Sequence, residues 1–92
     1  MSNTSKRLLV LGRRDHTEAM RVAAGLTIFG HSVQLVFMHE PVAETAENAA
    51  QAELLELSDI VPQTTVPGTE LEHLDAGALA MAVLECDAVI NI

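Results

Sequence analysis

Hydrophobic and polar residues follow one another in the first half of the chain as expected for a β-α-β unit. The apolar run at residues 8–11 is too short for a buried helix, so it predicts a strand covered on both faces. Asp15 precedes Glu18 by three residues, the spacing of a capping box, which predicts a helix that begins near His16. A second apolar run at residues 33–38 predicts the next strand, parallel to the first.

The first predicted helix carries its apolar residues at steps of three and four, which gives it one face directed at the sheet. Gly30 stands where the left-handed residue that ends a helix is expected. The residues predicted to face the sheet are Ala19, Val22, Ala23, Leu26 and Phe29.

The second half of the chain predicts two more helices and two more strands. Residues 48–57 favour a helix, whereas residues 43–47 fit either its first turn or a loop. Residues 60–66 favour a short strand, and Pro62 argues for an edge position or a partly extended segment. A last helix is predicted from an Asp75 cap to residue 84 or 85, with Leu79, Val83 and Met81 inward, before a closing strand at 88–92.

This order of elements predicts one α/β domain over residues 6–92. We expect a mostly parallel sheet of four or five strands with helices on both faces, a flavodoxin-like three-layer arrangement. Residues 1–5 are polar and are predicted to be a disordered tail. They contain no apolar segment of the kind found in a secretion signal, and the single cysteine allows no internal disulfide, so we expect a cytoplasmic protein.

Charge is distributed unevenly along the chain, whose formal net charge is −8. All five basic residues lie within the first 21 positions, and the rest of the chain carries eleven acidic residues. Five cations cannot offset this acidic remainder, and aromatic residues for base stacking are almost absent, so nucleic-acid binding is disfavoured. Two interpretations stay open: an anion site at the first helix, or docking of a basic corner onto an acidic face.

The apolar content of 49% is high for a small domain, and no segment reads as a membrane span. We therefore expect part of the surface to be covered by other subunits, with a compact monomer as the alternative.

Candidate functional residues follow from the predicted sheet. In open parallel sheets, ligands gather at the carboxyl ends of the strands, where polar residues follow the first two strands here. We take these as candidates for contact with a ligand or partner: Arg13, Arg14, His16, His39 and Glu40.

Motifs for catalysis, metals and nucleotides are weak or missing. The histidines do not have zinc-binding spacing, and neither a dinucleotide fingerprint nor a Walker lysine motif is present, so we expect no metal and no cofactor. Ser58 stands in no nucleophile elbow. Cys86 lies between Glu85 and Asp87 at a helix end, a poor setting for a reactive thiolate, and is interpreted as a packing residue. We assign no catalytic residue.

Three segments, taken in order, carry a resemblance to a known family: Gly30-His31-Ser32-Val33, then Glu40-Pro41-Val42, then residues 85–92. Together with the opening strand and helix, they resemble the DsrE/DsrF/DsrH family over nearly the whole chain. The resemblance implies a small cytoplasmic α/β protein that assembles into trimers or hexamers, alone or with related subunits. Some members of that family pass persulfide sulfur between cysteines.

This chain departs from that family at the residue that carries the sulfur. Active members have a cysteine in the loop after the third strand, which corresponds to residues 61–69 here, and this segment contains no thiol. Threonine cannot replace a thiolate as a persulfide carrier. The resemblance therefore implies a non-catalytic accessory or docking subunit related to sulfur relay. The alternative is a small protein that binds an anionic ligand or nucleotide with its strand-end loops.

Overall fold

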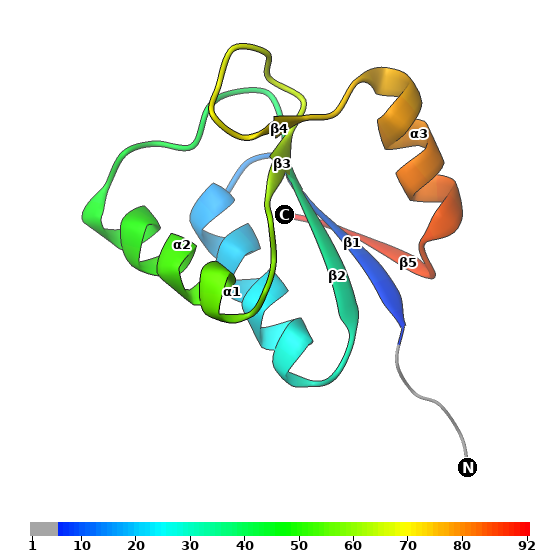
Figure 1. The fold of residues 1–92 in the computed structure, drawn as a ribbon, viewed down its shortest axis with the longest axis horizontal. Coiled ribbons are helices and arrows are strands. Elements are labelled where there is room, and N and C mark those ends of the chain that lie inside the picture. Colours follow the sequence, from blue (N-terminus) through cyan, green and yellow to red (C-terminus); the bar gives the residue numbers. More distant parts are fainter. Residues whose placement is uncertain (1–5) are drawn as a thin grey trace.

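The computed structural model describes residues 6–92, which form an α/β domain with an all-parallel five-stranded sheet and three helices (Figure 1). The predicted fold class is confirmed. The predicted tail, residues 1–5, lies outside the described residues. The elements follow in the order β1 (Arg7–Gly12), α1 (His16–Ile28), β2 (Ser32–Phe37), α2 (Ala46–Leu57), β3 (Gln63–Thr64), β4 (Glu72–His73), α3 (Ala76–Glu85) and β5 (Ala88–Asn91).

Strand β1 lies inside the sheet, whose strand order is β4-β3-β2-β1-β5. It pairs along its whole length with β2 and over four residues with β5. From β1 the chain moves outward through β2, β3 and β4, and then returns across the sheet to place β5 on the other side of β1. The strand order therefore reverses between β1 and β5, which makes the carboxyl ends of these two strands the topological switch point.

The helices cover both faces of the sheet, with α1 and α2 on one side and α3 on the other (Figure 1). The two faces are visible in the alternation along β1: Val10 packs with α1, whereas Leu9 and Leu11 pack on the side of α3. Helix α2 packs mainly against α1. The Thr17 hydroxyl donates a hydrogen bond to the amide oxygen of Asn48 across the contact between these two helices.

The helix ends form as the sequence predicts. The Asp15 carboxylate accepts the Glu18 N–H at 3.0 Å and so caps α1 at its first residue. Gly30 has the expected positive φ, 90°. Thr45 caps α2, so the helix includes residues 46 and 47 while 43–45 belong to the preceding loop.

Two predicted inward faces are wrong in part. Phe29 is 81% exposed because α1 ends at Ile28 and leaves Phe29 outside its last turn. In α3, Leu79 packs against the core as predicted, and Ala82 is buried beside it, whereas Met81 and Val83 are exposed. This helix is apolar on all sides, so its sequence does not reveal which side faces the core.

Of the two alternatives predicted for residues 60–66, the structure has the partly extended segment and not the edge strand. Only Gln63 and Thr64 join the ladder, and β4 pairs outside them through Glu72 and His73. Pro62 lies just before the strand, where its missing N–H does not interrupt the ladder. None of the helices within residues 6–92 is long and apolar enough to cross a membrane.

A side chain at Gly12 should destabilise the fold, because side chains of α1 and β2 fill the space beside this residue at the end of β1. A Cβ atom there would lie 3.1 Å from Ala19 Cβ and 3.1 Å from Phe37 Cδ1. We expect Gly12→Ala to lower the free energy of unfolding by about 1–3 kcal/mol in chemical denaturation. The matched control is Gly25→Ala in α1, where nothing lies within 4 Å of the added Cβ and stability should rise by about 0.5–1 kcal/mol. Equal stability of the two variants would contradict this packing.

Candidate functional site

A hollow of about 540 Å³ lies at the switch point, at the carboxyl edge of the sheet. Arg13 and Arg14 reach it from the loop after β1, and His39 reaches it from the loop after β2. Asn91 and Ile92 complete it from the end of β5. Of the described residues around this switch-point hollow, none has a carboxylate side chain, although the chain as a whole is strongly acidic.

The loop after β1 is held by a single main-chain oxygen. The N–H groups of Arg13, Arg14 and Asp15 all donate to the main-chain oxygen of Ile92, at 3.2, 2.9 and 3.3 Å. The Ile92 N–H in turn donates to Leu11 O at 2.9 Å. These loop N–H groups are therefore already satisfied, and an anion in the hollow would have to be bound mainly by side chains.

His39 is presented by an unusual turn. Its φ is 76°, and the Glu40 N–H donates to Met38 O at 2.9 Å, which together mark a γ-turn of the strained form with a positive central φ. A non-glycine residue in this region costs free energy and persists only where the surroundings hold it. Here the Met38 N–H is held by Gly12 O at 2.9 Å.

His16 supports this turn instead of lining the hollow. It is 9% exposed, its ring centroid lies 5.0 Å from that of Phe37, and its Nε2 lies 3.3 Å from Met38 O. A carbonyl oxygen only accepts, so Nε2 is the nitrogen that carries the proton and donates this bond. Its role is thus to anchor the first residue of α1 to the end of β2.

The five sequence candidates therefore divide into two groups. Arg13, Arg14 and His39 meet in the switch-point hollow, whereas His16 lies buried and Glu40 is exposed outside the lining. Asn91 joins the hollow although sequence reasoning did not select it. Its position could have indicated this role: Asn91 is a polar residue at the carboxyl end of an otherwise apolar strand. That strand, β5, pairs with β1.

The remaining basic residues lie elsewhere. Arg21, on α1, donates from Nε to Glu18 Oε1 at 2.8 Å, and this hydrogen bond lowers the pKa of the Glu18 carboxyl. Lys6 and Arg7 lie at the amino end of β1. Within residues 6–92, Arg13 and Arg14 are therefore the basic residues that face the switch-point hollow.

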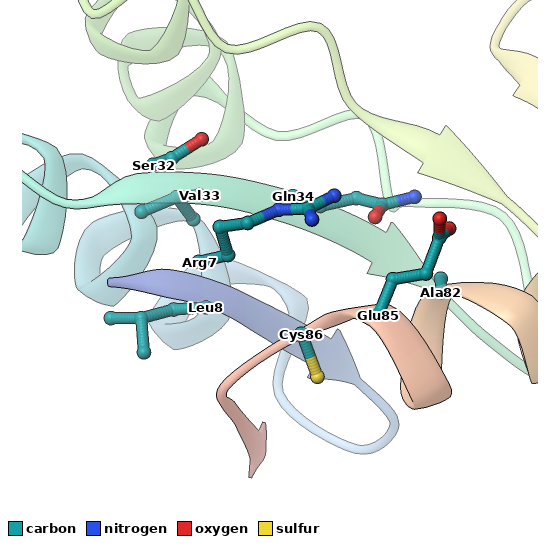
Figure 2. Close-up of a pocket in the computed structure, with 8 residues that line it drawn as sticks. All are labelled: Arg7, Leu8, Ser32, Val33, Gln34, Ala82, Glu85 and Cys86. Atoms are coloured by element: carbon teal, nitrogen blue, oxygen red, sulfur yellow. The ribbon is translucent and has the colours of Figure 1, made fainter. Parts of the chain in front are cut away.

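Cys86 lies at the amino edge of the sheet, opposite the hollow. It lines a small cavity of about 100 Å³ together with residues at the beginnings of β1 and β2. Figure 2 shows Arg7 extending towards Gln34, Glu85 on the same side, and the thiol directed away from them. The thiol lies 3.3 Å from Val83 O within its own helix end. Cys86 thus cannot supply a thiol at the carboxyl edge.

Metal binding finds no preformed site in the described part of the chain. Among residues 6–92, no three His, Cys, Asp or Glu side chains come together in a way that could hold a metal ion.

Comparison with known proteins adds no relative: no family model, no curated protein and no solved structure matches this chain.

Replacing His39 by glycine should relieve the γ-turn. We expect His39→Gly to be more stable than His39→Ala by about 1 kcal/mol, because alanine keeps the unfavourable positive φ and glycine does not. Both variants lack the imidazole, so the difference isolates the backbone contribution. Urea denaturation of the two variants gives this difference, and an alanine variant as stable as the glycine variant would show that the turn carries no strain.

Proposed function

We propose that this chain is a non-catalytic binding domain whose switch-point hollow receives an anionic group of a ligand or partner. The observation that supports this most strongly is the convergence of Arg13, Arg14 and His39 from two loops on one hollow at the switch point. Ligands of open parallel sheets bind at such points. Guanidinium groups favour carboxylate and phosphate partners, which they bind with paired hydrogen bonds.

We propose that the hollow binds the anionic group and does not catalyse a reaction on it. The hollow is open to solvent, and within residues 6–92 no cysteine, serine or threonine lines it beside the arginines. Asn91 adds an amide that can both donate and accept, which suits a group with several oxygens. A single cysteine is also what we expect of a protein from a reducing compartment, and a cytoplasmic location stays part of the proposal.

Phosphate should stabilise the native protein if it occupies the hollow. At ten times its Kd, an anion stabilises the native state by about 1.4 kcal/mol, enough to raise the melting temperature by several degrees in a domain of this size. We expect the double variant Arg13→Ala/Arg14→Ala to lose this shift. Differential scanning fluorimetry of both proteins with phosphate, sulfate and a nucleotide measures the shift in melting temperature.

The matched control is Lys6→Ala/Arg21→Ala, which removes the same number of positive charges away from the hollow. It should keep the phosphate shift. A loss of the shift in both double variants would mean that net charge, not the hollow, attracts the anion, and no shift in the unaltered protein would overturn the anion site.

A second proposal concerns assembly: the chain acts as an oligomeric accessory subunit related to sulfur relay, in keeping with its resemblance to the DsrE/DsrF/DsrH family. Its support is that residues 61–69 hold no thiol and that Cys86 lies at the opposite edge of the sheet. Such a subunit would act through protein contacts instead of sulfur transfer.

The surface that we propose for contact with another subunit is that of α3. Met81 and Leu84 are 55% and 79% exposed, and Glu85 is the one charged residue in the ten positions of this fully described helix. Large apolar side chains exposed together favour burial against a partner. Because most of the chain is acidic, a helix with a single charged residue is also a place where two copies approach with little repulsion.

Native mass distinguishes assembly from a monomer. We expect light scattering to give a multiple of the chain mass, and Leu84→Glu to reduce it because the carboxylate would be buried at the contact. Leu57→Glu at the end of α2 is the control, since Leu57 is equally exposed but lies on the other face of the sheet. A monomeric native protein would overturn the assembly proposal. If instead Arg13→Ala/Arg14→Ala lowers the mass, the hollow itself is the contact between subunits.

A further inference from the structure

A second and larger concavity lies on the same face as α1 and α2, apart from the switch-point hollow. This groove of about 870 Å³ runs between α2 and the segment that connects β3 to β4. Its volume lies in the range of small-molecule sites. Its lining comes from several parts of the chain, including the loop at residues 41–45 and the connection at residues 68–71.

The groove exists because α2 has small side chains on the side that faces β3. Helix α2 presents Ala49 and Ala52 to it, and α2 packs mainly against α1, so the space beside β3 stays unfilled. The floor is apolar and rigid: Phe37, Met20 and Leu55 are all buried in the main core cluster. Above this floor, Ala49 and Ala52 are exposed and Val42 and Leu71 are partly buried, so these are the side chains whose apolar surface a ligand would cover.

Polar groups around the groove favour one kind of head group. Of the described residues that line it, none is Lys, Arg or His, whereas Glu44 and Glu70 both contribute carboxylates at its exposed rim. Thr45 and Thr69 each use the hydroxyl oxygen to accept a main-chain N–H, from Asn48 at 3.0 Å and from Leu71 at 3.3 Å. An anion would be repelled here, and a cation would be attracted.

We propose that this groove binds a small molecule with an apolar body and a positively charged amine head group. The apolar body would lie against the accessible apolar lining, namely Val42, Ala49, Ala52 and Leu71. The amine would lie near the rim carboxylates of Glu44 and Glu70. This site has the opposite charge preference from the switch-point hollow, so the two sites take different ligands. The groove proposal does not depend on the anion site.

A matched ligand series tests the proposal by ¹H–¹⁵N NMR titration: hexylammonium, 1-hexanol and hexanoate share one apolar chain and differ in head group. We expect hexylammonium to shift the amide signals of Ala49, Ala52 and Thr69 and to bind roughly three-fold more tightly than hexanol, with hexanoate weakest. Hexanoate binding as tightly as hexylammonium would overturn the charge preference. The absence of shifts at these amides with all three compounds would overturn the site.

Variants separate the groove from general attraction to an acidic protein. Glu44→Gln/Glu70→Gln should reduce hexylammonium binding to the level of hexanol, whereas Glu47→Gln/Glu53→Gln, on exposed positions of α2, should not. Ala52→Leu should fill the groove and abolish binding of all three compounds, while Ala50→Leu, which lies outside the lining, should leave it intact. The proposal would be overturned if each groove variant and its control lowered hexylammonium binding by the same amount.

Discussion

The central position of β1 is the constraint on which the rest of this structure depends. Leu9 and Val10 point to opposite faces and are both fully buried, so this strand must be covered by helices on either side and paired on either edge. Pairing with β5 brings the end of the chain's last strand beside the loop after β1, where Ile92 O takes three main-chain N–H groups. The position of the arginines at the switch point follows from this arrangement.

The elements around β1 could be predicted because their sequence signals agree with their packing. An apolar run, a capping aspartate and a helix-ending glycine all specify the same β-α-β unit. Strand β4 has no such signal: it consists of Glu72 and His73, both exposed, and has neither an apolar run nor alternation. A strand of two residues is specified by the strand it pairs with, here β3, and not by its own residues.

The candidate site, like the fold, could be predicted only in part. Arg13 and His39 follow strands that were expected to be adjacent and parallel, so their meeting at one edge follows from the topology. Asn91 could not be chosen before β5 was known to pair with β1. The burial of His16 depends on its contact with Phe37, which periodicity does not reveal. The groove beside α2 also escaped prediction, because alanines at Ala49 and Ala52 indicate a helix and say nothing about the space in front of them.

The arrangement around β1 is tested most directly by native-state hydrogen exchange of the loop after this strand. If the switch point is built as described, the amides of Arg13, Arg14 and Asp15 are protected by Ile92 O and exchange slowly, together with those of β1, despite belonging to exposed residues. Exchange of these three amides at the rate of an unprotected loop would contradict the pairing of β1 with β5, and with it the site at the switch point.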